Sequence, residues 1–393
     1  MEIIRGKYGN EVKVYANTIE EEARIQISNL ADYEPYRNSK IRIMPDVHAG
    51  KGCTIGTTMA INNAITPNLV GVDIGCGMLA VKLNDSDIDF NRLDYCIRKY
   101  IPSGFNVNSC HTRHFDLNNL RCLNGIDTSR VDKSIGTLGG GNHFIEVDYS
   151  EADKCYYLVI HTGSRNLGVQ VCRYYQDLAV KSMNDRKDRS KLIKELKESG
   201  REREISSELK KLGTVNIDKD LAYLTGENFD DYINDMEIVQ DYASVNRHAI
   251  SDIITSFMCF HVDNIFETIH NYIDTFRMIL RKGAVSAEIG EKLIIPMNMH
   301  DGSLVCVGKG NEKWNYSAPH GAGRIMSRTK AKENIELIDY KDIMNGIYST
   351  SVNYSTLDEA PQAYKPMDEI LSCIGDTVGV IDIIKPVYNF KAN

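Results

Sequence analysis

Hydrophobic and polar positions follow two distinct patterns along the chain. In the first pattern, short apolar runs such as Tyr156–Ile160 and Leu293–Ile295 are bounded by glycine or proline, which predicts buried strands. This glycine-rich pattern occupies residues 41–82, 135–168 and 281–324. It therefore predicts the strands of the fold.

The second pattern is helical. Residues 175–212 are dense in Lys, Glu and Arg, and we interpret them as a solvated helical hairpin broken near Ser199-Gly200. The leucines at helical spacing in this run are Leu192, Leu196, Leu209 and Leu212. Acidic and basic residues are mixed here, which disfavours the alternative of a nucleic-acid-binding arm. From Asp231 to about Phe276 the pattern again predicts long helices, ending before a turn at Arg281-Lys282-Gly283.

Both patterns fit one α+β domain. We find no internal repeat and no Pro- or Ser-rich linker, and only 9 of the 393 residues are proline. We therefore predict a single domain over residues 1–393, with mixed and antiparallel sheets flanked by helices. Residues 175–280 are expected to form a charged, mainly helical insertion.

The net charge of −8 excludes a general polyanion binder, so any contact with nucleic acid must rest on local cations or metal ions. None of the ten cysteines forms a Cys-x-x-Cys pair, which argues against a zinc ribbon or a thioredoxin-like motif. The first residues lack the apolar core of a signal peptide, and no run of about eighteen apolar residues occurs. We expect a cytoplasmic protein with reduced thiols and no membrane contact.

Candidate metal ligands begin in Gly71–Gly77, where three glycines allow a sharp turn. Asp73 and Cys76 lie three residues apart on this turn, and both could bind one metal site. The alternative is a buried cysteine that packs as a small hydrophobic residue.

Three histidines extend this set. His143 follows a glycine run, and His161 ends the predicted strand Tyr157–Ile160, where a ligand has rigid support. His270 lies in a predicted helical stretch, and a core histidine is the alternative there. Together with the two ligands of Gly71–Gly77 they make five, enough for two metals sharing a bridging group, which suits phosphoryl transfer. Thiolate and imidazole favour Zn, Fe or Co, and carboxylate favours Mn or Mg, so the metal stays open.

Ala318–Arg324 carries a different chemistry. Small residues after His320 leave backbone N–H groups free to meet an anion, and Arg324 adds a planar cation suited to phosphate. A histidine beside such a cradle can attack a nucleoside triphosphate, whereas the alternative is a turn with an exposed histidine. No P-loop motif occurs. Two weaker candidate phosphate cradles are Gly139–Asn142 and Gly308–Asn311.

Seven blocks, in this order, resemble the RtcB family of RNA ligases over nearly the whole chain: Pro45–Gly52, Gly71–Gly77, Gly141–Glu146, His161–Arg165, Arg281–Ala287, Pro319–Arg324 and Asp358–Lys365. The resemblance implies an RtcB-like α+β fold and a GTP-dependent active site with two Mn²⁺. It also implies a ligase that joins 2′,3′-cyclic phosphate or 3′-phosphate RNA ends to 5′-hydroxyl ends through a histidine–GMP intermediate. RNA repair and tRNA splicing are the expected roles, and the need for an archease-like activator stays open.

The same resemblance assigns residues to roles. The implied metal ligands are Asp73, Cys76, His143, His161 and His270, with Cys76 bridging, and the implied nucleophile is His320. The implied nucleotide contacts are Asn142, Phe144, Glu146, Asn298, Ser303, Gly321, Ala322, Gly323, Tyr364 and Lys391. The implied RNA phosphate contacts are Arg165 and Arg324.

The chain departs from the family pattern in two places. Many members carry Pro-Gly-Ser-Met-Gly where this chain has Pro296–Ser303, so that Asn298 replaces a serine near the nucleotide. We expect nucleotide binding to survive, with guanine selectivity the property put in question, and we expect His300 to be structural or peripheral. The ending Lys391-Ala392-Asn393 replaces the more usual Lys-Gly, which bears on the assignment of Lys391.

Two other classes of protein remain as alternatives. A two-metal phosphatase or nuclease would use the same five ligands, but it would leave His320 and its Gly-Ala-Gly-Arg sequence without a role. A non-catalytic RNA-end binder predicts the loss of the nucleophile or of a ligand, and every one of these residues is present.

Overall fold

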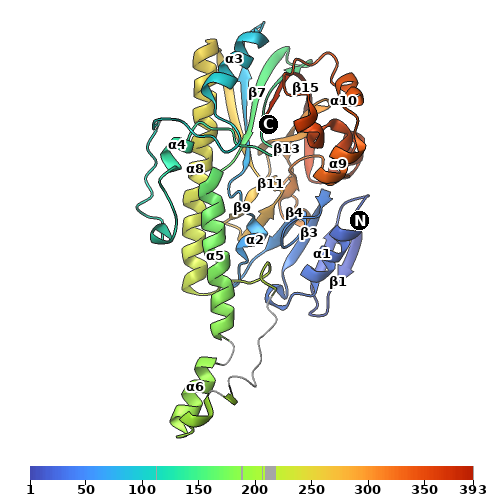
Figure 1. Cartoon of the computed structure of the whole chain (residues 1–393). Coiled ribbons are helices and arrows are strands. Elements are labelled where there is room, and N and C mark those ends of the chain that lie inside the picture. The colour runs from blue at the N-terminus through green and yellow to red at the C-terminus, as the bar shows by residue number, and fades with distance from the viewer. Residues whose placement is uncertain (112, 187–188, 206, 209–217, 393) are drawn as a thin grey trace.

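The protein is described by a computed structural model that covers residues 1–111, 113–186, 189–205, 207–208 and 218–392 (Figure 1). The helices are α1 Glu21–Ala31, α2 Pro67–Val70, α3 Phe90–Tyr100, α4 Val131–Ser134, α5 Arg165–Arg186, α6 Arg189–Glu198, α8 Glu227–Met258, α9 Arg328–Asn334, α10 Leu337–Ile343 and α11 Met367–Ile374. The short 3-10 turns are η1 Glu34–Tyr36, η2 Leu123–Gly125, η3 Glu202–Glu204, η4 Glu312–Trp314, η5 Tyr354–Glu359 and η6 Pro361–Ala363. The strands are β1 Glu2–Arg5, β2 Glu11–Val14, β3 Lys40–His48, β4 Ile55–Ala60, β5 Gly77–Leu83, β6 Phe144–Ser150, β7 Cys155–Thr162, β8 Val262–Ile269, β9 Asn271–Asp274, β10 Ile279–Lys282, β11 Ala284–Ser286, β12 Lys292–Asn298, β13 Gly302–Gly308, β14 Ser317–Pro319 and β15 Val378–Lys391.

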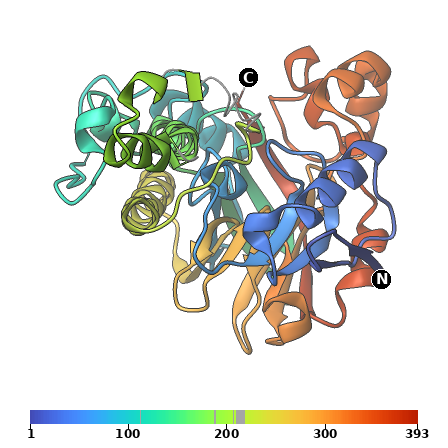
Figure 2. The same cartoon turned by 90° about the horizontal axis from the view of Figure 1, so that it is seen from below.

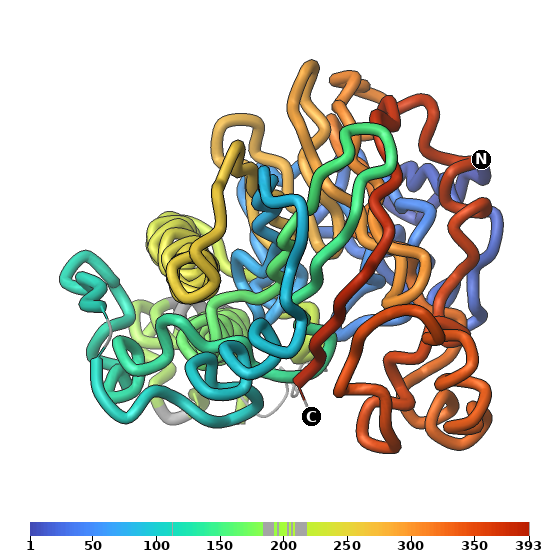
Figure 3. The backbone as a smooth tube through the Cα atoms, turned by 90° about the horizontal axis from the view of Figure 1, so that it is seen from above, coloured from blue at the N-terminus to red at the C-terminus, as the bar shows by residue number. Residues whose placement is uncertain are grey.

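Two large sheets and one small sheet organise these strands. The seven-stranded sheet has the order β12-β13-β15-β6-β7-β5-β8, and all of its pairs are antiparallel. The six-stranded sheet has the order β1-β2-β3-β4-β10-β9, with β2 and β3 parallel. Figure 3 shows β15, in red, running between β6 and β13. This position sets Lys391 opposite Phe144 at the edge of the functional cavity described below.

Two long helices, α5 and α8, run side by side along one flank of the sheets (Figures 1 and 2). Buried side chains of α8 recur at helical spacing, among them Met236, Val239, Ala243 and Ile250, so one apolar face packs inward. The helix ends at Cys259, whose left-handed backbone closes the last turn. Among the described residues, no helix has both the length and the apolar character needed to cross a membrane.

The predicted α+β class and several predicted elements are confirmed. Tyr156–Ile160 lies in β7 and Leu293–Ile295 lies in β12. The charged run folds as the end of α5 followed by α6. Helix α6 ends at Glu198, close to Gly200, whose φ is 70°. Leu196 is buried and Leu192 partly buried, while the predicted helical positions Leu209 and Leu212 lie outside the described residues.

The helix predicted from Asp231 to Phe276 is wrong beyond Met258. Residues 262–269 form β8 and residues 271–274 form β9, so the helical part of the predicted 175–280 insertion ends well before residue 280. The β-branched residues of β8 suit a strand, and pairing with β5 along the sheet edge decides between the two conformations. The expected turn at 281–283 is also shifted, because Arg281 and Lys282 end β10 and only Gly283 turns, with φ 59°.

Candidate active site

Backbone close approach shapes the segment that carries Asp73 and Cys76. Gly75 has φ 69°, and a Cβ there would lie 2.9 Å from the Gln240 Cα of α8, so only glycine lets the turn rest against this helix. A Cβ at Gly163, just beyond β7, would lie 2.3 Å from Asp73 Oδ1. The local sequence therefore brings the carboxylate against the backbone at the end of β7.

The five predicted metal ligands converge. Cys76 Sγ lies 3.5 Å from His143 Nε2 and 3.4 Å from His161 Nε2. Around it the ligand atoms form two groups, one of Asp73, Cys76 and His143 and the other of Cys76, His161 and His270, each within 4.8 Å. Cys76 belongs to both groups, which is the arrangement required of a bridging ligand.

Backbone carbonyls orient the imidazoles. His143 Nδ1 lies 2.9 Å from the Leu138 carbonyl, and His161 Nδ1 lies 3.2 Å from the Asn142 carbonyl. A carbonyl only accepts, so each Nδ1 carries a proton, and each Nε2, which faces Cys76, is the ring atom that can bind a metal. His270 Nε2 lies 3.1 Å from His161 Nε2, so it faces the same centre.

The electrostatics of these donors fit a cation. Burial, with help from neighbouring histidines, lowers the pKa of His161 and of His270 well below the usual range, so both rings are neutral. Burial alone would raise the pKa of Asp73, but hydrogen bonding and charge from His143 lower it to about 2. Burial and the Asp73 charge raise the pKa of the Cys76 thiol well above normal. A thiolate here therefore needs a bound cation, and the thiolate, imidazole and carboxylate set suits a transition metal.

One buried cation, which no sequence pattern singled out, holds the segments with the candidate ligands together. The Arg247 side chain is fully buried, and its Nη1 donates to the carbonyls of Gly75 (2.7 Å) and Thr162 (2.8 Å). Its Nε donates to Glu267 Oε1 at 2.6 Å. Arg247 thus joins the turn before Cys76 to the end of the strand that carries His161.

His320 lies beside this centre, with its ring centroid 4.7 Å from that of His270. A single oxygen, Asp46 Oδ2, accepts three hydrogen bonds, from His320 Nδ1 (2.6 Å), the His320 backbone N–H (3.0 Å) and the Gly321 backbone N–H (3.3 Å). Asp46 is fully buried in β3. Because Nδ1 donates to a carboxylate, Nε2 of His320 is left with a free lone pair.

The pairing of Asp46 with His320 was missed in the sequence, although Asp46 stood in the first of the seven blocks. A carboxylate inside the apolar run Ile41–Val47 was the available indication, because a buried charge needs a partner. The segment after His320 fits tightly against it: a Cβ at Gly323 would lie 2.2 Å from the Asp46 carbonyl oxygen.

A cavity of about 470 Å³ opens beside these groups. The predicted site residues that line it are Asn142, Phe144, Glu146, His161, Asn298, His320, Gly321, Ala322, Gly323, Arg324, Tyr364 and Lys391. Lys391 Nζ lies 5.5 Å from the centre of the Phe144 ring and forms an ion pair with Glu359. Tyr364 donates to Glu359 at 2.8 Å, so this buried carboxylate ties two cavity residues together.

Glu146 lines the cavity, and the fully buried Asp148 lies two residues further along β6. Glu146 accepts a hydrogen bond from Asn389, and the Glu146 and Asp148 carboxyl groups share a hydrogen bond. Burial raises the pKa of both groups, and the Glu146 charge raises that of Asp148 further. The pair therefore holds a proton at pH values where an exposed carboxyl group has lost it.

Two predicted contacts stand apart from the open cavity, and a third is engaged by a neighbouring side chain. Ser303 is fully buried in β13 and is not among the cavity-lining residues described. Arg165 is likewise not among those lining residues, and it donates to Thr137 (3.1 Å) and to the Gly104 carbonyl (2.9 Å). Asn298 does line the cavity, but its amide group donates to Asp301 at 2.8 Å and so is already engaged.

Hydrogen bonds and ion pairs also hold Arg324 and His300, the latter in the segment Pro296–Ser303 that departs from the family pattern. Arg324 Nη2 donates to the Asp358 carbonyl at 2.6 Å, and the guanidinium lies 5.1 Å from the centre of the Tyr364 ring. His300 is exposed and pairs with Asp301 at 3.1 Å, outside the metal-ligand groups.

Comparisons with known proteins identify the family of the chain. The sequence profile of the family described as "tRNA-splicing ligase RtcB" matches residues 26–126 and 123–392. The chain is similar to "RNA-splicing ligase RtcB" of Escherichia coli K12, with 32% identity over 95% of each chain. It is also similar to "tRNA-splicing ligase RtcB" of Aeropyrum pernix, with 27% identity over 91% of this chain and 88% of the relative. "RNA-splicing ligase RtcB homolog 1" of Entamoeba dispar is 28% identical over 84% of this chain and 74% of its own.

Proposed function

The chain belongs to the RtcB family of RNA ligases, and from that premise we propose that it joins 2′,3′-cyclic phosphate or 3′-phosphate RNA ends to 5′-hydroxyl ends through a His320–GMP intermediate. The observation that carries the proposal is the placing of His320, held through Nδ1 by Asp46, between a nucleotide-sized cavity and a cluster of five metal-ligand side chains. A role in tRNA splicing or in RNA repair follows from this chemistry.

The five clustered side chains would hold two Mn²⁺ ions, with Cys76 in both ligand sets. When bound, the ions would supply positive charge that offsets the negative charge of triphosphate and RNA phosphate. Their ligands are fixed by β5, β7 and the Arg247 hydrogen bonds, so the site needs little rearrangement to bind them.

His320 is the proposed nucleophile. Its Nε2 attacks the α-phosphorus of GTP, the bond to pyrophosphate breaks, and a phosphoramidate to GMP forms. The ring gains positive charge as this bond forms, and Asp46, 2.6 Å from Nδ1, stabilises that charge. The backbone of Gly321–Gly323 lines the cavity next to His320 and would meet phosphate oxygens there.

The remaining steps act on RNA. Water first opens a cyclic phosphate, and the resulting 3′-phosphate then attacks the phosphorus on His320, which restores the free imidazole. The 5′-hydroxyl next attacks the activated 3′-phosphate, and GMP leaves. Phe144, Glu146, Tyr364 and Lys391 line the cavity that would hold the nucleotide during these steps. Arg324 lies at this cavity, so it would meet RNA phosphate more directly than Arg165.

A labelling experiment tests the proposal. The protein is incubated with Mn²⁺ and α-labelled GTP, denatured, and examined for an acid-labile, alkali-stable adduct. We expect His320→Ala to abolish the label and the matched control His261→Ala to retain it, because His261 is an exposed histidine that also pairs with an aspartate. Label that survives His320→Ala would refute the nucleophile.

Metal content gives a second, independent reading. Cys76→Ala removes the residue shared by both ligand groups, so metal uptake and the adduct should be lost together. Normal metal content in that variant would refute the ligand assignment. A protein that forms no adduct with any nucleotide, yet releases phosphate from RNA ends, would instead be the alternative two-metal phosphatase or nuclease.

A further inference from the structure

Phe105 is the most exposed large hydrophobic residue that the structure describes, with 97% of its surface accessible. Its backbone is nevertheless held at several points. The Gly104 N–H donates to the Gly139 carbonyl (2.8 Å), Arg165 donates to the Gly104 carbonyl (2.9 Å), and Arg130 donates to the Phe105 carbonyl (2.8 Å). A fixed loop thus presents an aromatic ring to solvent, and packing gives no reason for it.

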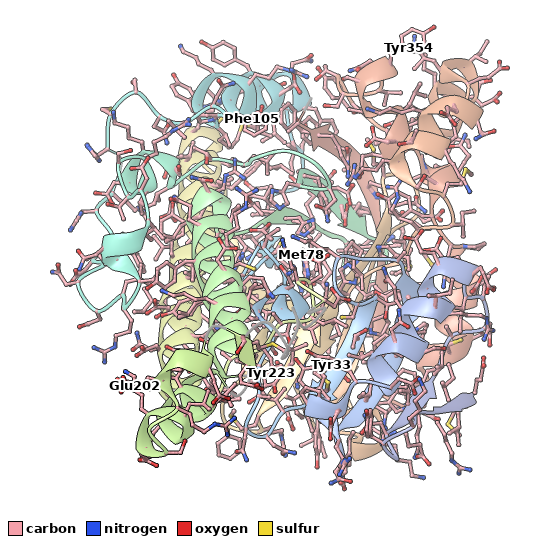
Figure 4. The ribbon with its side chains drawn as sticks, turned by 60° about the horizontal axis from the view of Figure 1, so that its bottom comes forward. Tyr33, Met78, Phe105, Glu202, Tyr223 and Tyr354 are labelled. Carbon is pink, nitrogen blue, oxygen red and sulfur yellow. The ribbon has the colours of Figure 1, made fainter. Side chains whose placement is uncertain are left out.

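The loop rests against the glycine run that leads into the active site. A Cβ at Gly140 would lie 3.6 Å from the Gly104 Cα, so the two backbones touch. Two residues further on, Asn142 lines the cavity, and His143 follows as a metal-ligand residue. Figure 4 shows Phe105 at the end of the molecule formed by α3, above Met78 of the cavity wall.

Cations flank the Phe105 loop along the sequence, since residues 97–133 carry six Lys or Arg and three Asp. Three of these cations form ion pairs with aspartates outside the segment, namely Arg98 with Asp94, Arg113 with Asp252 and Arg121 with Asp231. Arg130 is exposed and donates to the Phe105 carbonyl, so it keeps one cation beside the loop. The end of α3 that leads into the loop is also aromatic and cationic, since Lys99 Nζ lies 5.1 Å from the rings of both Tyr95 and Tyr100.

We propose that Phe105 stacks on a base of the unpaired RNA strand that enters the cavity, while Arg130 attracts its backbone. Exposed aromatic rings among cations are the usual platform for single-stranded nucleic acid, because every base offers a face to stack on. This inference rests on the proposed function, which supplies the RNA end. The exposed Arg130 beside the loop and the direct continuity with the glycine run favour RNA over an apolar protein partner as the occupant.

Phe105→Trp turns the position into a reporter. The chain has one tryptophan, Trp314, which is only 2% exposed, so the background emission responds little to ligand. We expect a single-stranded RNA with a 3′-phosphate to quench the emission of F105W. The same strand with abasic residues over its last four positions keeps the phosphates and should not quench.

The second measurement is the affinity of each variant for a fluorescently labelled copy of the same RNA, determined from its anisotropy. Phe105→Ala should weaken binding about 5- to 100-fold, the range expected for loss of one stacked base. Phe276→Ala is the matched control, because Phe276 is 91% exposed on the turn between β9 and β10 and should leave affinity unchanged. Unaltered thermal unfolding of each variant would show that the fold is intact.

Wild-type affinity in Phe105→Ala, or equal quenching by the intact and the abasic strand, would overturn the inference. Neither titration requires GTP or formation of the His320 adduct. A wild-type protein that forms no adduct therefore refutes the proposed function, whereas quenching that depends on the bases still supports a stacking role for Phe105.

Discussion

Replacing Asp46 by asparagine tests the link between the buried carboxylate and His320. The amide is nearly isosteric, so its oxygen can still accept from His320 Nδ1, and its NH₂ group would occupy the place of Oδ1, which has no partner in the described structure. The perturbation therefore removes one negative charge and leaves the packing of β3 in place. Asp46 is not among the metal-ligand groups, so metal content should be unchanged.

The expected loss follows from the distance. A full positive charge on the His320 ring, 2.6 Å from the carboxylate oxygen, would be stabilised by about 6 kcal/mol at an effective dielectric constant of 20. The charge is only partly developed in the transition state, and the amide keeps a neutral hydrogen bond of roughly 1 kcal/mol. A net loss of about 3–5 kcal/mol remains, which slows formation of the His320–GMP adduct by roughly 10²- to 10⁴-fold.

The assay is the initial rate of label transfer from α-labelled GTP to denatured protein at saturating Mn²⁺. Asp85→Asn is the control, since Asp85 also accepts from both the backbone and the Nδ1 of a histidine, the exposed His261, at 2.8 and 3.1 Å. That variant should react at the wild-type rate. If Asp46→Asn reacted within about threefold of wild type, the carboxylate would not stabilise charge on His320 and the magnitude argued above would be wrong.

Three further variants probe the surroundings of the site. Gly163→Ala would put a methyl group 2.3 Å from Asp73 Oδ1, and we expect Mn²⁺ affinity, measured by metal titration, to fall about 10- to 100-fold; unchanged affinity would contradict the clash. Arg247→Met leaves Glu267 without its buried partner, so urea denaturation should show a loss of about 3–5 kcal/mol in the free energy of unfolding. A loss under about 1 kcal/mol would show that Arg247 does not hold these segments together. Asp148 has a raised pKa in the folded state, so the folded protein keeps a proton that the unfolded chain releases above about pH 4, and stability declines as pH rises through that window. Asp148→Asn should flatten this decline, so the unfolding temperature of the variant should exceed that of the wild type more at pH 8 than at pH 5. A pH dependence equal to that of the wild type would contradict the raised pKa of Asp148.

The sequence predicted strands correctly where the local apolar run alone indicated the strand, without knowledge of its pairing partner. Tyr156–Ile160 and Leu293–Ile295 are short, β-rich and bounded, and both are buried strands. Val262–Ile269 was mistaken for helix because its strand conformation depends on pairing with β5, some 180 residues earlier in the chain. No local pattern carries that information.

The candidate site divides in the same way. The convergence of the five candidate metal ligands could be predicted because their residue types are unusual beside glycine, and His270 joined them although its predicted element was wrong. The role of Asp46 could not be predicted, since 274 residues separate it from His320 and only the folded chain brings them together. Ser303 was assigned to the nucleotide by resemblance, but the sequence does not show that this residue is fully buried in β13 and does not line the cavity.

The central position of β15 has a consequence for how the protein is made. A ribosome that has translated residue 320 has already joined all five metal-ligand residues and His320 into the nascent chain. Until residues 378–391 emerge, however, β6 and β13 each lack the neighbour between them and present open edges. The cavity beside His320 thus closes late in synthesis, and the incomplete sheet is the stage at which the nascent protein is most exposed to aggregation.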